Sequence, residues 1–186
     1  MSRQNRIVVI LFLSILSLSS CQSQTTTEQD TDSIKPPPAV AGKEPDYNYV
    51  LEVPDGWTIR DTTMPGGLKI RFLLSPISLS ADYPAGNVVI ALMEGRTIDE
   101  FTTRNMDYLK SNMEGITIIE RGNIDSTTYN GQWFTYTKDQ NGVVRDMINY
   151  IIPLNGFAYM ITFGANQGSM HKHRTTFDKI ARSFKG

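Results

Sequence analysis

The chain has few of the residues from which metal and nucleophile sites are usually built. Its 186 residues include one cysteine, Cys21, and two histidines. His171 and His173 stand two positions apart, and on a helix such side chains point to nearly opposite sides. They would not converge on one ion, so we expect no metal site, and no motif indicates a cofactor.

An excess of charge and long hydrophobic runs are also missing. The net charge is −1, and residues 47–186 hold fourteen Lys and Arg against fourteen Asp and Glu. Without a basic stripe, nucleic acid is not an expected partner. The longest apolar run, residues 7–18, has twelve residues, whereas a membrane-spanning helix needs roughly 20.

Motifs for nucleophilic catalysis, calcium binding and phosphate binding are all incomplete. No Gly-x-Ser-x-Gly elbow surrounds Ser169, so this residue fits a helix N-cap better than a catalytic nucleophile. Asp139 begins a stretch like a calcium loop, yet its twelfth position is Tyr150 where a bidentate Glu is needed. Pro65-Gly66-Gly67 lacks the Lys and Ser or Thr of a phosphate-binding loop. Both glycine-containing segments indicate turns, and no enzyme activity is predicted.

Cys21 ends a stretch that has the three parts of a secretory signal peptide. Arg3 and Arg6 precede the apolar run 7–18, and small residues follow it. The stretch Leu18-Ser19-Ser20-Cys21 resembles the lipobox of bacterial lipoproteins. The resemblance implies cleavage before Cys21, a diacylglyceryl group on its thiol and acylation of the new amine. The alternative is an ordinary signal peptide with a chance cysteine.

Lipidation would place the protein in the bacterial cell envelope and leave no thiol for a disulfide or a nucleophile. We expect a signal peptide over 1–20, a lipidated cysteine and disordered tether over 21–46, and one domain over 47–186. The tether is too polar to bury a core and reaches on the order of 25–30 Å. The periplasmic face of the outer membrane is the expected location, although the choice of membrane and leaflet stays open.

Three Asn-Gly pairs give the strongest signal for the fold. They stand at 130–131, 141–142 and 155–156, between runs rich in β-branched and aromatic residues. Asn and Gly tolerate the positive φ of tight hairpin turns, so the pairs predict antiparallel hairpins. The predicted strands of this meander cover about 123–129, 132–138, 143–152 and 157–165.

The last predicted strand has two faces of low polarity. One carries Phe157, Tyr159, Ile161 and Phe163; the other carries Ala158, Met160, Thr162 and Gly164. This pattern predicts a sheet that is covered on both sides.

Two helices flank the meander in the sequence. Thr97 and Glu100 form a capping box, which predicts a helix to about Met113 that buries Phe101, Tyr108 and Leu109 and stops at Gly115. A second helix is predicted from Ser169, with an apolar stripe of Phe177, Ile180, Ala181 and Phe184. Further strands are predicted over 47–53, 68–74 and 87–93. The order indicates an α+β fold, an antiparallel sheet with helices packed on it.

Three segments resemble PsbP-like domains. Residues 49–57 are similar to the opening strand and Pro-x-Gly-Trp corner of that family, with Pro54, Gly56 and Trp57 as its architectural residues. Residues 95–100 resemble its turn and helix start, and 157–162 followed by 177–184 resembles its last strand and helix. The resemblance implies an α/β/α sandwich around a hairpin and a four-stranded meander.

The resemblance implies a docking or accessory role but supplies no site residue. Members of the fold are mostly non-catalytic: some resemble extrinsic subunits of photosystem II, others resemble Ran-binding import factors, and many bacterial relatives are lipoproteins. We therefore expect a lipoprotein that docks on another envelope protein.

Two other functions stay open from the residues alone. One is a carrier with a ligand pocket between the sheet and a helix, with Tyr or Arg side chains as polar anchors. Arg71 and Arg145, both in predicted strands, either lie on an open face or line a cleft for an anion. The least favoured alternative is a hydrolase with carboxylates such as Asp125, Asp139 and Asp146.

Overall fold

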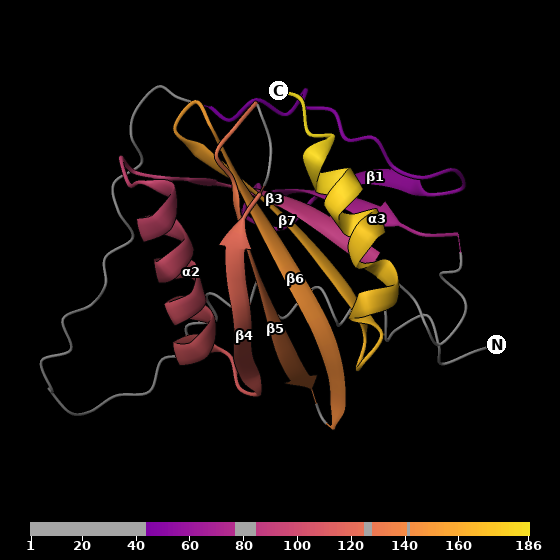
Figure 1. Cartoon of the computed structure of the whole chain (residues 1–186). Coiled ribbons are helices and arrows are strands. Elements are labelled where there is room, and N and C mark those ends of the chain that lie inside the picture. Colours follow the sequence, from indigo (N-terminus) through magenta and orange to yellow (C-terminus); the bar gives the residue numbers. More distant parts are fainter. Residues whose placement is uncertain (1–43, 77–84, 125–127, 141) are drawn as a thin grey trace, which may run out of the picture. The chain divides into compact units, whose positions relative to one another are not determined.

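The computed structural model describes residues 44–76, 85–124, 128–140 and 142–186. Within these ranges, seven strands form one antiparallel sheet with two helices (Figure 1). The strands are β1 (Thr58–Thr63), β2 (Lys69–Leu74), β3 (Ala85–Leu92), β4 (Ile116–Asn123), β5 (Gln132–Gln140), β6 (Val143–Leu154) and β7 (Phe157–Asn166). The helices are α2 (Ile98–Asn112) and α3 (Met170–Arg182). Cys21, the predicted signal peptide and nearly all of the predicted tether lie outside the described residues.

The sheet is ordered β1-β2-β3-β7-β6-β5-β4, and every neighbouring pair is antiparallel. The chain leaves β3 through α2, begins again at the far edge with β4, and returns strand by strand until β7 pairs with β3. This topology confirms the α+β fold with an antiparallel meander.

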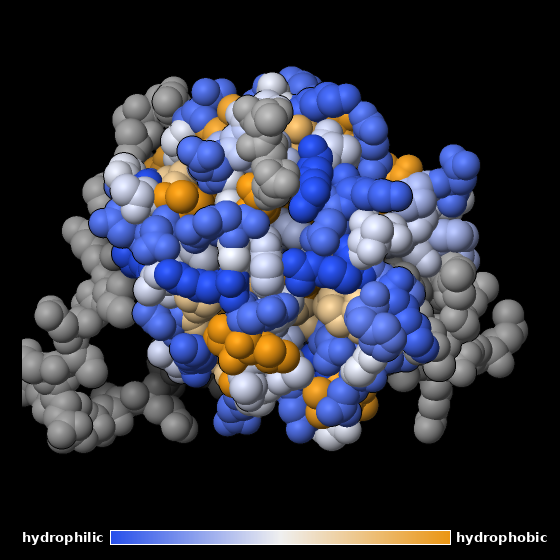
Figure 2. Space-filling view, viewed as in Figure 1, coloured by the Kyte–Doolittle hydropathy of each residue, from blue (hydrophilic) through white to orange (hydrophobic). Residues whose placement is uncertain are grey.

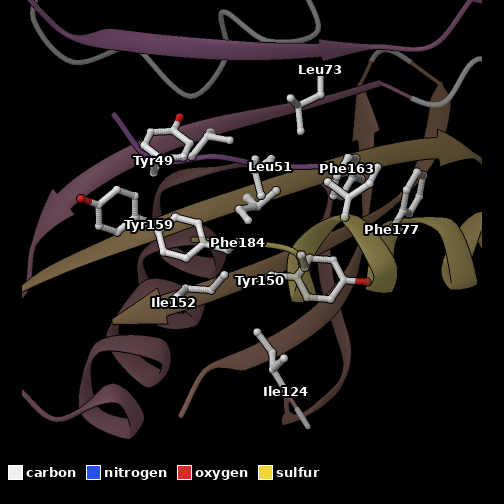
Figure 3. Packing of buried hydrophobic residues seen from close by; sticks show 14 of the residues in the cluster. Tyr49, Leu51, Leu73, Ile124, Tyr150, Ile152, Tyr159, Phe163, Phe177 and Phe184 are labelled. Atoms are coloured by element: carbon white, nitrogen blue, oxygen red, sulfur yellow. The ribbon is translucent and has the colours of Figure 1, made fainter. Parts of the chain in front are cut away.

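The two helices lie on opposite faces of the sheet, as the low-polarity faces of β7 predicted. Phe157, Tyr159, Ile161 and Phe163 belong to the core cluster under α3. The alternate residues Ala158 and Met160 belong to the cluster under α2. Figure 3 shows Tyr49, Tyr159 and Phe184 gathered at one end of the α3-side cluster and Phe163 and Phe177 at the other.

The start of α2 is confirmed in detail. The Glu100 amide donates to Thr97 Oγ1 at 3.3 Å, and the Thr97 amide donates to Glu100 Oε2 at 2.8 Å. The helix ends at Asn112, and Gly115 follows with φ +71°. The prediction that Tyr108 is buried is wrong, since this side chain is 40% exposed. The buried stripe is centred on Thr102, Met106 and Leu109, so Tyr108 lies at its rim.

Helix α3 begins after Ser169, and its predicted apolar stripe is buried. Phe177, Ile180 and Ala181 of the helix are each at most 1% exposed, and Phe184, which follows the end of the helix at Arg182, is 3% exposed. The rings of Phe163 in β7 and Phe177 are parallel, with centroids 4.3 Å apart. Ser169 holds the N-cap position, but its hydroxyl donates to the Asn166 carbonyl instead of accepting a helix amide.

Three strand predictions need correction. Residues 47–53 form no strand; among them Val50 makes one isolated bridge to Lys185, while Tyr49 and Leu51 are buried on the sheet face. The first meander strand is β4, not 123–129, so Asn130-Gly131 ends a longer connection between β4 and β5. Strand β1 was not predicted, because its sequence TIRDTT is a mostly exposed edge without an apolar repeat.

The short turns agree better with the sequence. Pro65-Gly66-Gly67 lies in the turn between β1 and β2, and both glycines have positive φ. Asn155 and Gly156 join β6 to β7 with φ of 54° and 86°, as expected for a tight hairpin. Asn141 lies outside the described residues, but Gly142 in the same turn has φ 79°.

Candidate functional site

A groove of about 400 Å³ lies on the α3-side face of the sheet, over β1, β2 and β3. Helix α3 packs on β6 and β7 and leaves this part of the face to the segment Tyr47–Tyr49. The register places two rows of side chains on the groove floor. One row is Asp61, Arg71 and Val88, and the next is Thr63, Lys69 and Ile90.

Arg71 joins the edge of the sheet to the segment that crosses it. Its Nε donates to Asp61 Oδ1 at 2.8 Å and its Nη2 to Asp61 Oδ2 at 3.0 Å. Its Nη1 donates to the Tyr49 carbonyl at 2.9 Å, and its Cζ lies 4.4 Å from the centroid of the Tyr49 ring. The hydrogen bond from Arg71 holds the pKa of Asp61 below its usual range. This bidentate geometry is the strong form of an Arg–carboxylate pair.

Contacts of Tyr49 and Tyr159 hold the crossing segment, which forms one wall of the groove, in place. The Tyr159 hydroxyl donates to the Asp46 carbonyl at 2.8 Å. The Tyr49 ring meets the Tyr159 ring edge-on and stacks on Phe184, with centroids 5.3 and 5.6 Å apart (Figure 3). Burial raises the pKa of the Tyr49 hydroxyl. Tyr49 is therefore a neutral wall of the groove.

Lys69 supplies an exposed positive charge in the groove. Its Nζ lies 4.2 Å from the centroid of the Tyr47 ring, and no ion pair of Lys69 occurs within the described residues. With Arg71 it gives the groove two cations against the single carboxylate of Asp61. This arrangement suits a ligand or partner group with an anionic end and a flat apolar part, since Tyr47 offers a ring face and Lys69 an unpaired charge.

A second polar feature lies on the opposite, α2-side face. Asn87, Thr162 and Asn149 stand side by side on β3, β7 and β6 and are 2%, 4% and 6% exposed. The Oδ1 atoms of both asparagines are buried without a hydrogen-bond partner. Such orphaned acceptors are rare in proteins, because leaving them unpaired costs stability.

The structure separates the residues that the sequence raised as candidates. Arg71 lines the groove, whereas Arg145 lies on the other face of the sheet, so the two do not form one cleft. Trp57 is half-buried and packs against the α3-side cluster, with its ring edge-on to Phe163. Trp57 therefore borders the core cluster and is only partly buried.

Two of the carboxylates that were candidates for a hydrolase site accept hydrogen bonds from backbone amides in turns. Asp139 Oδ1 accepts from the Gly142 amide at 2.9 Å, and Asp146 Oδ2 accepts from the Gly168 amide at 2.8 Å; Asp125 lies outside the described residues. Across the part of the chain that the structure describes, no group of three His, Cys, Asp or Glu could hold a metal ion. His173 stacks on Phe177 instead, with centroids 5.9 Å apart.

Sequence reasoning identified Arg71 but missed Tyr47, Tyr49 and Lys69. The groove exists because 47–49 crosses the sheet face, and the alternating apolar residues of that segment also fit a strand. The aromatic residue Tyr47 at the start of this segment was the one local signal available.

The surface around these features is mostly hydrophilic. Figure 2 shows apolar side chains of the described residues in small groups between polar ones on the face in view. Large exposed apolar residues are spread over several elements, namely Val50, Ile59, Tyr108, Ile119 and Val143. Of the helices described, none has the length and hydrophobicity to span a bilayer.

No protein-family model matches the sequence, and no curated protein matches it. Solved structures match its fold. LpqN of Mycobacterium tuberculosis, which is involved in cell envelope biogenesis, superimposes with a TM-score of 0.56 at 13% identity, covering 74% of this chain and 82% of LpqN. Cyanobacterial PsbP from Synechocystis sp. PCC 6803 gives 0.56 at 16% identity, covering 74% of this chain and 85% of PsbP.

A third structure, protein PA94 of Pseudomonas aeruginosa, has unknown function. It gives a TM-score of 0.56 at 8% identity and covers 69% of this chain and 96% of its own. At these identities the likeness concerns architecture and not activity. The antiparallel sheet, its two covering helices and these matches together show that the chain has a PsbP-like fold.

Proposed function

We propose that the protein is a non-catalytic accessory protein of the bacterial cell envelope, held at the membrane by a lipid on Cys21. The PsbP-like fold carries this proposal, because its solved examples include cyanobacterial PsbP and the envelope-biogenesis protein LpqN. The lipobox-like stretch ending at Cys21 supports the envelope location. The carboxylates with turn-capping roles, Asp139 and Asp146, give no support to a hydrolase.

The groove is the favoured docking place for a protein partner. Its floor and walls are held rigidly, since Arg71 binds both Asp61 and the Tyr49 carbonyl. Lys69 and Tyr47 stand at its exposed side without an ion pair among the described residues. A partner segment with a carboxylate and an adjacent apolar side chain would complement them, since charge complementarity favours specific association.

Site-specific photocrosslinking in intact cells tests this role. A photoreactive amino acid replaces Thr63, an exposed residue of the groove, and in a matched control it replaces Tyr108, which is exposed on α2. We expect Thr63 to capture one envelope protein that Tyr108 does not capture. When Lys69→Glu is added to the protein with the photoreactive residue at position 63, that capture should be reduced. Equal capture at both positions, or capture unaffected by Lys69→Glu, contradicts docking at the groove.

The groove also favours a second function, the transport or storage of a small anionic ligand. Its volume of about 400 Å³ lies within the range of small-molecule sites. Native mass spectrometry of protein purified from its own cells separates the two functions. A co-purifying small molecule that is lost in Lys69→Glu supports the carrier, and a ligand-free protein with a groove-dependent crosslink supports docking.

A further inference from the structure

Two cations stand directly opposite each other on the α2-side face of the sheet, far from the groove. Lys138 in β5 pairs in register with Arg145 in β6. Their side chains share the face that carries Tyr136 and Met147, since both of those residues lie two positions away in the same strands. Like charges at directly opposed positions destabilise a strand pair, so this arrangement needs an explanation.

Neither cation has a counterion in the described protein. Lys138 is only 9% exposed, and Arg145 is half-buried with its Nε sealed from solvent and without a hydrogen-bond partner. No ion pair joins either residue to the rest of the chain that the structure describes. Burial lowers the pKa of the Lys138 ammonium, which reflects the cost of keeping a charge there.

Other partly buried arginines of this protein are paired. Arg71 binds Asp61, Arg96 binds Glu94, and Arg174 binds Asp178 with Nε–Oδ1 at 3.0 Å. A buried cation without a partner is therefore the exception within the described ranges. Its persistence on two adjacent strands indicates that a group outside the described residues supplies the negative charge.

The nearest carboxylates in the sequence cannot neutralise the pair. Asp139 and Asp146 each follow one of the cations, so strand alternation directs them to the opposite face. They are also occupied there, since they accept the amides of Gly142 and Gly168 at 2.9 and 2.8 Å.

The charged ends remain accessible to an incoming group. Arg145 Nε is buried without a hydrogen-bond partner. Lys138 Nζ and the two Nη atoms of Arg145 also make no hydrogen bond within the described residues, but they are not buried in this way. The stems are thus buried while three nitrogen donors meet solvent. An Arg guanidinium beside a Lys ammonium is a common binding site for a phosphate group. The guanidinium donates two hydrogen bonds to the phosphate oxygens, and the ammonium donates a further one.

We propose that Lys138 and Arg145 form a binding site for a phosphate group. The group belongs either to a small phosphorylated molecule or to a phospholipid headgroup, and both would offer the same oxygens to the pair. This inference rests on the α2-side face alone and does not depend on docking at the groove.

Calorimetric titration of the processed protein in a neutral detergent tests the site. The probes are inorganic phosphate, glycerol phosphate as a monoester, and glycerophosphoglycerol as the phosphodiester of a lipid headgroup, all at constant ionic strength. We expect saturable binding of at least one probe, weakened about tenfold or more in Lys138→Gln and in Arg145→Gln, since each removes a charged hydrogen bond. Preference for the monoester or inorganic phosphate identifies a small molecule, and preference for the phosphodiester identifies a lipid headgroup.

Two controls separate binding from folding and from net charge. Lys172→Gln removes one exposed charge on α3, on the other face of the sheet, and should bind as the unaltered protein does. Lys138→Arg keeps the charge and should retain most of the affinity. Both Gln variants should melt no lower than the unaltered protein, because each relieves a like-charge repulsion. Absence of saturable binding to all three probes, or equal binding by the Gln variants, overturns the proposal.

Discussion

The guanidinium of Arg71 connects strand β2 to two other parts of the chain. It binds the Asp61 carboxylate of the edge strand β1, the Tyr49 carbonyl of the crossing segment, and the face of the Tyr49 ring. Sequence placed Arg71 in a strand and left open whether it faced solvent or a cleft. The answer depends on where Tyr49 lies, a contact across 22 residues that no local pattern encodes.

Trp57 offers a test of core packing at the residue scale. Its ring is half-buried against the α3-side cluster, with its centroid 6.4 Å from that of Phe163. Trp57→Ala should lower the free energy of unfolding by about 2–4 kcal/mol, toward the lower end of the cost for a large buried ring. Denaturant titration measures it; an unchanged midpoint would show that Trp57 is a surface residue. Ile59→Ala, at an exposed position nearby in β1, is the control.

Asn149 tests the orphaned polar row. Its Oδ1 atom is buried without a partner beside Thr162, so the amide costs stability without making a compensating bond. Asn149→Leu has a similar size and should raise the free energy of unfolding by about 1 kcal/mol, because it removes that unpaired group. A denaturant titration that shows a loss would mean that the amide has a bonded partner, such as an ordered water.

At the scale of elements, the helices and strands that a short local motif specifies could be predicted from the sequence, and those that depend on distant contacts could not. Helix α2 is specified by its capping box, and the strands β6 and β7 by the turn Asn155-Gly156. Strand β1 has no apolar repeat, because an edge strand with one polar face needs none. The prediction of a strand over 47–53 is wrong, because alternating apolar residues also occur in a segment that lies across the face of a sheet. The groove could not be predicted for that reason.

The capping box of α2 gives a prediction for one element. Thr97→Ala removes the Oγ1 acceptor of the Glu100 amide and should cost about 1 kcal/mol. Ser111→Ala near the exposed end of the same helix is the control and should change little. Thermal unfolding followed by circular dichroism compares them. Equal melting temperatures for both variants would contradict a stabilising role of the cap.

At the scale of the whole molecule, buried tyrosines tie stability to pH. Burial raises the pKa values of Tyr49, Tyr136 and Tyr150, and a hydrogen bond to Asp178 adds to the effect at Tyr150. Raised values mean that the folded state holds these protons more tightly. Their contribution is therefore complete below the ordinary value of 10.0 and is lost as the pH rises above it.

We accordingly expect the melting temperature to fall steadily above about pH 10. Phenolate absorbance should show one set of tyrosines ionising in the folded protein and a second set ionising only with unfolding. If all eight tyrosines ionised together while the circular dichroism stayed native, the assignment of neutral buried tyrosines would be wrong.

The proposed function links a PsbP-like domain to a membrane through one residue, Cys21. Metabolic labelling with a clickable fatty acid tests that link most directly, with the unaltered protein and Cys21→Ser compared in the same cells. We expect strong label on the unaltered protein and none on the variant, because no other cysteine can carry the thioether. Undiminished label on Cys21→Ser, or no label on the unaltered protein, would contradict a lipid-anchored envelope protein.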